Sequence, residues 1–140
     1  MSEQTRRSVT LRRTAAGRLV ATNARGVELA VSGSGDDTFS PVELLLAAIA
    51  GCTALDVDAL TSRRAEPESF ELRASGDKIR DQSGNRLENV EVVFDVTFPA
   101  GEGGDAARAV LPDMVARSHD RLCTVTRTVE RGTEVRFRIE

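Results

Sequence analysis

Hydrophobic residues fill positions 44–55 almost without interruption. Thr53 and the Cys52 thiol are the only side chains of this segment that carry a polar group. A helix that is apolar on every side must be enclosed rather than laid on a surface. We therefore expect this segment to form the core helix of the fold, and Cys52 is the one chemically reactive group on it.

The residues in front of this segment carry the signals of a helix start. Ser40 and Glu43 stand three residues apart, as in a capping box, and Pro41 suits the first helical position. The pattern predicts a helix from Pro41 to Ser62 or Arg64. At about 1.5 Å per residue it would be roughly 33 Å long, which is comparable to the width of a small domain.

Apolar and polar residues alternate with a period of two on both sides of the core helix, and this predicts strands. We expect a meander of three strands before the helix, followed by a flexible loop over Gly33–Thr38. Two strands should follow the helix, joined by a polar connection over Gly76–Asn89, and another should close the chain. The expected strands cover residues 9–13, 19–22, 27–31, 70–74, 90–98 and 135–139.

Two further helices are expected between the last strands. The first should run from Asp105 to Arg117, with Pro112 kinking or splitting it. Asp120 would cap a shorter helix over Arg121–Val129, which carries Cys123 in its first turn. This order predicts an α+β fold with a largely antiparallel sheet. One such sheet does not cover the core helix on every side, so we expect a homodimer that encloses both core helices.

The chain has 140 residues, which fits a single domain over residues 1–140. Its 19 basic and 22 acidic residues give a net charge of −3, and Trp and Tyr are absent. Neither feature supports binding to nucleic acid or to an anionic membrane. The first seven residues lack a secretory signal, and no apolar run reaches the length of a membrane span. We expect a cytoplasmic protein whose two cysteines are reduced, catalytic or redox-active.

The two thiols are the leading candidates for chemistry. Cys52 lies on one helical stripe with Leu45, Ile49 and Asp56, while Cys123 stands at a helix start that favours its thiolate. Such a pair is typical of a peroxidatic and a resolving cysteine. The first thiolate attacks a peroxide and becomes a sulfenic acid, and the second condenses with it to a disulfide. A purely structural role for a buried cysteine stays open.

Other groups give weaker signals. His119 is the only histidine and lies four residues before Cys123, so a Cys–His hydrolase is a further hypothesis. A solvated histidine at a helix junction is the simpler interpretation. Two distant cysteines and one histidine do not form a recognisable metal-ligand spacing. Glu43 lies nine residues before Cys52, on the opposite face of the predicted helix. Glu43 could therefore reach only the Cys52 of a partner chain.

The segment 40–53, which begins Ser-Pro-Val-Glu and ends Ala-Gly-Cys-Thr, resembles the family of osmotically induced protein C and the organic hydroperoxide resistance proteins. The segment 123–127 and the order of elements agree, so the resemblance covers nearly the whole chain. It implies an intertwined homodimer and a thiol peroxidase for organic hydroperoxides, without metal or bound cofactor. By matching position, Cys52 would be the peroxidatic thiol and Cys123 the resolving one, reduced by an external dithiol or lipoyl-type reductant.

The chain departs from the family's pattern at supporting positions. In the well-known peroxidases a glutamate directly follows the proline, whereas here Val42 follows it and the acid comes next, at Glu43. Arg18 is the nearest candidate for the activating arginine, and Arg12, Arg13 or Arg25 could also serve. Asp56 should raise the pKa of Cys52 by like-charge repulsion. These departures favour an alternative function, a non-enzymatic redox-responsive or small-ligand-binding dimer with the same fold.

Overall fold

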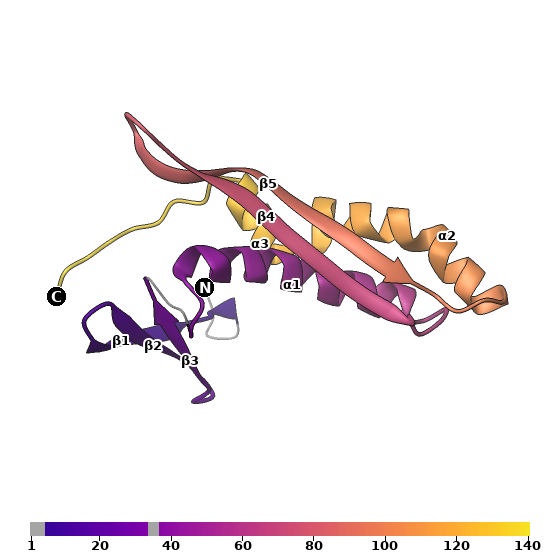
Figure 1. The fold of residues 1–140 in the computed structure, drawn as a ribbon, viewed down its shortest axis with the longest axis horizontal. Helices are drawn as coiled ribbons and strands as arrows, with labels where there is room; N and C mark the ends of the chain where they lie inside the picture. Colours follow the sequence, from indigo (N-terminus) through magenta and orange to yellow (C-terminus); the bar gives the residue numbers. More distant parts are fainter. Residues whose placement is uncertain (1–4, 34–36) are drawn as a thin grey trace. The chain divides into compact units, whose positions relative to one another are not determined.

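The computed structural model describes residues 5–33 and 37–140 and has a mixed α+β architecture (Figure 1). It divides into two compact units, residues 1–45 and residues 46–140, which are described separately. The elements are β1 (Val9–Ala15), β2 (Arg18–Asn23), β3 (Glu28–Ser32), α1 (Pro41–Thr61), β4 (Ser69–Asp81), β5 (Gly84–Thr97), α2 (Glu102–Arg117), the π-helix η2 (Ser118–Leu122) and α3 (Thr124–Glu130).

The first unit is the predicted antiparallel meander, with strand order β1-β2-β3. In its register Leu11 faces Ala21, which in turn faces Leu29. The end of β3 is its most buried part, since Val31 and Ser32 are 2% and 4% exposed. The predicted loop over Gly33–Thr38 lies partly outside the described residues.

The predicted capping box starts α1. The Ser40 backbone N–H donates to Glu43 Oε1 at 2.9 Å, and the Glu43 N–H donates to Ser40 Oγ at 3.2 Å. Two otherwise unpaired donors at the helix start are thus satisfied. The helix ends at Thr61, one residue before the nearer predicted end.

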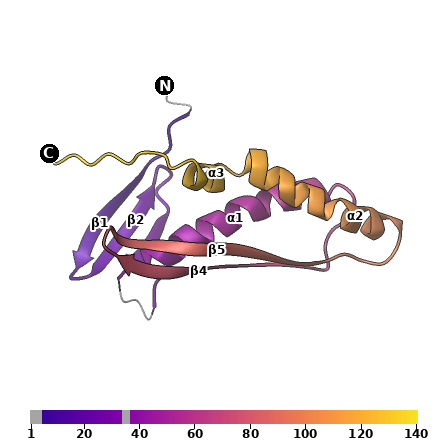
Figure 2. The same ribbon diagram turned by 90° about the horizontal axis from the view of Figure 1, so that it is seen from above.

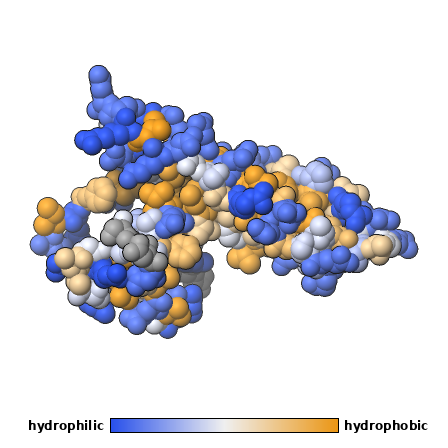
Figure 3. Space-filling view, viewed as in Figure 1, coloured by the Kyte–Doolittle hydropathy of each residue, from blue (hydrophilic) through white to orange (hydrophobic). Residues whose placement is uncertain are grey.

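Within the second unit, α1 is buried along one face only. Its buried residues are spaced four apart, as one face of a helix requires. They are Ile49, Thr53, Val57 and Thr61. On another face, Leu55 is 73% exposed. A single chain therefore leaves much of the apolar helix uncovered, and Figure 3 shows hydrophobic residues open on the face in view. By length and composition alone, α1 would also be able to cross a membrane, a test that the core helices of soluble proteins pass too.

Strands β4 and β5 form one long antiparallel hairpin. Their half-buried residues alternate with exposed ones and pair across the strands, as Phe70 with Val96 and Leu72 with Phe94. Figures 1 and 2 show α1 and α2 running along this hairpin. The polar connection expected over Gly76–Asn89 is wrong, because both strands continue through it to a turn at residues 81–84. Arg86 forms ion pairs with Asp81 and Glu88 there, so polar side chains hold this end of the hairpin.

The N-cap of helix α2 is Gly101, four residues before Asp105, the residue expected to cap this helix. Its first turn lies against the preceding chain. A Cβ on Gly104 would lie 1.6 Å from the carbonyl oxygen of Pro99, so only glycine fits. Pro112 lies inside the helix and does not split it, and the helix passes directly into η2.

The closing strand predicted over residues 135–139 is absent from the structure. Val135, Phe137 and Ile139 are 72%, 93% and 98% exposed, and no described strand pairs with them. The alternating pattern is that of a strand, but a strand needs a hydrogen-bonded neighbour, and this chain offers none to the tail among its described residues.

Candidate functional site

Three side chains of the second unit meet at one point. Cys52 and Asp56 stand four residues apart on α1 and therefore share one face of the helix. Cys123 arrives from the junction of η2 and α3. The two sulfur atoms and a carboxylate oxygen of Asp56 all lie within 4.8 Å of one another. The structure thus brings together the two predicted thiols, although 70 residues separate them in the sequence.

The end of η2 positions Cys123. The Cys123 N–H donates to the Ser118 carbonyl at 2.8 Å, and the backbone then becomes extended at Cys123. The Cys123 sulfur caps α3 by accepting from the Thr126 N–H at 3.4 Å, and its thiol donates to Thr126 Oγ1 at 3.2 Å. Cys123 is therefore the N-cap of this helix, and the predicted cap at Asp120 is wrong.

A chain of hydrogen bonds fixes Asp56. The Ser118 hydroxyl donates to Asp56 Oδ2 at 2.9 Å. The Ser118 hydroxyl oxygen also lies 2.7 Å from Thr53 Oγ1. Because the Ser118 proton already points to Asp56, the Thr53 hydroxyl must donate this second hydrogen bond. Thr53 and Ser118 are buried. Sequence reasoning missed Ser118. The only signal was Thr53, which carries the one hydroxyl of the apolar segment 44–55.

Burial raises the pKa of the Cys52 thiol above its ordinary value. A hydrogen bond with Cys123 and the negative charges of Cys123 and Asp56 raise this pKa further, while the Val125 backbone N–H lowers it. The predicted effect of Asp56 is confirmed in direction. Cys123 is fully buried and Cys52 half-buried, so the Cys52 sulfur is the more accessible of the two.

His119 does not form the dyad with Cys123 that the hydrolase hypothesis requires. Its Nδ1 lies 2.8 Å from Asp120 Oδ1 and its Nε2 lies 3.2 Å from Glu130 Oε2, so both ring nitrogens are engaged by carboxylates. Asp120 and then Glu130 raise the His119 pKa, because both stabilise the imidazolium. The arrangement does not support a Cys–His hydrolase.

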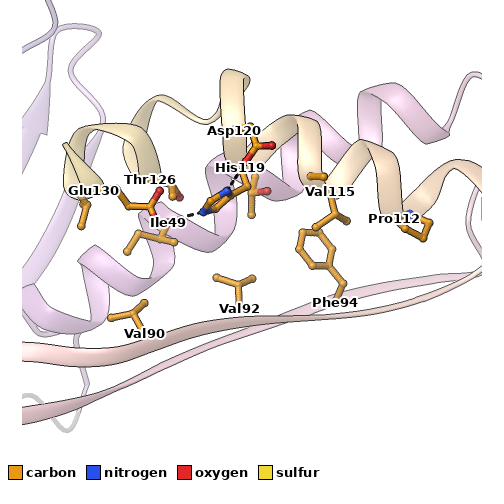
Figure 4. Close-up of a pocket in the computed structure, with 13 residues that line it drawn as sticks. Ile49, Val90, Val92, Phe94, Pro112, Val115, His119, Asp120, Thr126 and Glu130 are labelled. Atoms are coloured by element: carbon orange, nitrogen blue, oxygen red, sulfur yellow. Dashed lines mark hydrogen bonds and ion pairs between the residues drawn. The ribbon is translucent and has the colours of Figure 1, made fainter.

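A cavity of about 490 Å³ is lined by residues of α1, β5, α2, η2 and α3 (Figure 4). Ile49 of α1, Val92 and Phe94 of β5 and residues of α2 give it apolar walls, while His119 and Glu130 line its polar side. Neither cysteine is among its lining residues, but two lining threonines are bonded to them. Thr53, next to Cys52, and Thr126, which bonds to Cys123, both line it.

The two predicted supporting residues belong to the first unit. Arg18 forms an ion pair with Asp37 at 3.3 Å, and both side chains are half exposed or more. Glu43 is used in the capping box, where hydrogen bonds from the backbone and side chain of Ser40 lower its pKa. Both residues thus have local partners, and their role towards Cys52 stays a prediction.

The fold has been solved in several bacterial proteins. An OsmC-like protein of unknown function from Vibrio cholerae matches with a TM-score of 0.75 and 17% identity, over 90% of this chain and 94% of that one. A hypothetical protein from Aquifex aeolicus matches with a TM-score of 0.72 and 21% identity, over 91% and 89% of the two chains. The organic hydroperoxide resistance protein OhrB of Bacillus subtilis matches with a TM-score of 0.56 and 18% identity, over 89% and 91%.

Comparison with curated proteins found no match. The family model described as OsmC-like protein matches residues 33–138, which include α1, the β4–β5 hairpin and both cysteines. The sequence resemblance noted above is therefore confirmed, and the chain belongs to the family of OsmC-like proteins.

Proposed function

We propose that this protein is a cysteine-dependent peroxidase that reduces organic hydroperoxides. One observation carries the proposal: the sulfur atoms of Cys52 and Cys123 lie within 4.8 Å of each other. A disulfide requires a sulfur–sulfur distance of about 2.05 Å. To form the bond, the two atoms would therefore have to approach by less than about 3 Å.

The cycle uses Cys52 as the nucleophile. Its thiolate attacks the terminal oxygen of the hydroperoxide, the O–O bond breaks, and the leaving alkoxide takes a proton to become an alcohol. The Cys52 sulfenic acid then reacts with the Cys123 thiolate, which forms the disulfide and releases hydroxide. An external dithiol or lipoyl-type reductant returns both thiols by disulfide exchange and is itself oxidised. The Thr126 N–H, 3.4 Å from the Cys123 sulfur, stabilises the resolving thiolate.

The apolar cavity that Thr53 and Thr126 help to line supports an organic substrate. Its walls from Ile49, Val92 and Phe94 would remove the apolar part of a hydroperoxide from water, at about 25 cal/mol per Å² of apolar area buried. Hydrogen peroxide has no such part and gains nothing from these walls. The cavity therefore favours organic hydroperoxides over hydrogen peroxide.

Activation of Cys52 requires a positive charge that the second unit does not place next to it. Among the described residues, the groups that shift the pKa of Cys52 are the Val125 backbone, Cys123 and Asp56, none of them cationic, and the pKa is raised. We propose that the protein acts as a homodimer in the cytoplasm, in which a second copy covers the exposed face of α1 around Leu55. Arg18 and Glu43 of that copy would then complete the site.

The test is the intact mass of the denatured protein after a brief dose of an organic hydroperoxide. We expect the loss of two hydrogens, mapped to a Cys52–Cys123 disulfide and reversed by a dithiol. Cys123→Ser should stop at the sulfenic acid, which gains one oxygen, and Cys52→Ser should consume no peroxide. Unchanged consumption by Cys52→Ser would refute the assignment. These are the only two cysteines, so no other disulfide can form within one chain.

The raised pKa of Cys52 favours a second candidate, a non-enzymatic dimer that binds a small ligand in the cavity. In this case Cys52 would remain a neutral thiol at neutral pH. Thiol titration with a small alkylating reagent separates the two functions. A Cys52 that stays unreactive near pH 7 and resists hydroperoxide, in a protein shown to be dimeric, supports the binding function.

A further inference from the structure

The three groups that meet at the thiol site are all ligands for metal ions. Cys52 and Cys123 supply two sulfur atoms and Asp56 supplies a carboxylate oxygen, all within 4.8 Å of one another. Two of these residues stand at positions i and i+4 of one helix, a spacing that places two ligands on the same face. The third comes from a different segment. Three donors thus converge from two elements, as in a tetrahedral site with one open position.

We propose that Cys52, Asp56 and Cys123 of the reduced protein bind one Zn²⁺ ion, with water as the fourth ligand. The site requires neither the peroxidase activity nor a bound substrate. It goes beyond the proposed function because it assigns the same thiols a second chemistry.

The distances fit this ion after a small adjustment. In a tetrahedral zinc site with Zn–S bonds of about 2.3 Å, two sulfur atoms lie about 3.8 Å apart. The sulfur atoms of Cys52 and Cys123 lie within 4.8 Å and need to approach by about 1 Å or less. Cys52 is half-buried, so an ion and its water can approach from that side. Two sulfur donors select a thiophilic ion such as Zn²⁺ over Ca²⁺ or Mg²⁺, which prefer oxygen.

The groups around the donors orient them. The Ser118 hydroxyl holds Asp56 Oδ2 at 2.9 Å, and among the described residues no hydrogen bond engages Oδ1, which is left for the ion. Thr53 in turn holds Ser118. The Thr126 N–H donates to the Cys123 sulfur without blocking its remaining lone pairs. Partners of this kind fix the direction of metal ligands in known sites, and losing one commonly weakens binding about 10- to 100-fold.

Charge also favours a cation here. With both thiols deprotonated and Asp56 ionised, the site carries three negative charges, and Zn²⁺ reduces the total to −1. Binding releases two protons, one from each thiol. A disulfide between Cys52 and Cys123 removes both sulfur donors at once, so metal binding and the disulfide exclude each other. The metal-bound form is therefore restricted to the reduced protein.

The experiment is a titration of the reduced, metal-free protein with Zn²⁺ under argon, in competition with a chromogenic zinc chelator. We expect one ion per chain. Asp56→Asn should weaken binding by about 10-fold or more, and Cys52→Ser should abolish it. Asp58→Asn is the matched control, because it removes the same charge from an exposed position of the same helix and should leave the affinity unchanged. Equal affinities of Asp56→Asn and Asp58→Asn would overturn the proposal.

Two further measurements keep the outcome clear if a variant folds poorly. Co²⁺ should give thiolate-to-cobalt charge-transfer absorption and tetrahedral d–d bands with the wild-type protein. Oxidation of the wild-type protein with diamide to the Cys52–Cys123 disulfide should abolish Zn²⁺ binding, and a dithiol should restore it. Zinc binding that survives complete oxidation contradicts the site. Failure of the peroxidase proposal has a different signature, because it appears as no disulfide after hydroperoxide while zinc titration still gives one ion per chain.

Discussion

The hydroxyl of Ser118 is predicted to be worth far more to stability than an ordinary serine hydroxyl. It is fully buried and makes two hydrogen bonds, with Thr53 Oγ1 at 2.7 Å and with Asp56 Oδ2 at 2.9 Å. A neutral hydrogen bond contributes about 1 kcal/mol and one to a charged group about 1.5–3 kcal/mol. Asp56 is half-buried, so water can replace the Ser118 hydroxyl in the variant, and this reduces the contribution of the Ser118–Asp56 hydrogen bond to stability. Ser118→Ala should therefore lower the free energy of unfolding by about 2 kcal/mol.

The assay is urea unfolding of the reduced protein, with a metal chelator present and at one fixed protein concentration, since self-association would shift the midpoint. Ser69→Ala is the matched control. It also removes a serine hydroxyl that lies 2.6 Å from a threonine hydroxyl, that of Thr97, but this pair is exposed. We expect the control to cost less than about 0.5 kcal/mol.

A double-mutant cycle tests the reasoning behind this magnitude. If Ser118→Ala leaves the buried Thr53 hydroxyl without a partner, then adding Thr53→Val should cost less in the Ser118→Ala background than alone. The coupling should be about 0.5–2 kcal/mol. Additive effects, or a Ser118→Ala loss no larger than that of Ser69→Ala, would show that the buried chain is not what holds η2 against α1.

Three further predictions concern other parts of the chain. Glu130→Gln should lower the pKa of His119, which Asp120 and Glu130 hold above its ordinary value of 6.5, and an NMR titration of the ring measures the change. The two ion pairs of His119 stabilise the fold below pH 6.5, and this stabilisation is lost as the pH rises through the raised pKa. Ser40→Ala removes a helix cap and should lower the free energy of unfolding by about 1 kcal/mol, measured by urea unfolding. Phe137→Asp should weaken self-association by about 10-fold or more in sedimentation experiments if the exposed tail packs on a second copy; an unchanged association constant excludes the tail from the interface.

Local signals predicted what local interactions determine. The capping box of Ser40 and Glu43 spans four residues, and both of its predicted hydrogen bonds are present. The stripe that joins Cys52 and Asp56 follows from the helical period alone. The hairpin was predicted too short because its polar residues were assigned to a loop. The backbone ladder of β4 and β5 satisfies its own hydrogen bonds, so exposed polar side chains on both faces do not end it.

Interactions distant in sequence were beyond such reasoning. Ser118 lies 65 residues after Thr53 and 62 after Asp56, and nothing in its neighbourhood marks it as their partner. The closing strand predicted over residues 135–139 is absent for a different reason. Its alternation at Val135, Phe137 and Ile139 is a sound strand pattern, but the pattern does not say which strand completes the ladder, and none of the described strands does.

The features that make Cys52 a poor nucleophile in a single chain are the features that suit it to a cation. Burial, the Cys123 thiol and the Asp56 carboxylate all disfavour the thiolate, which must form before the sulfur can attack a peroxide. A positive charge placed among the same three groups reverses this balance. An arginine from a second copy would produce a reactive thiolate, whereas Zn²⁺ would produce a thiolate already bonded to metal. The chemistry of the site therefore depends on which positive charge reaches it, and peroxide reactivity and zinc affinity should be measured on the same reduced preparation.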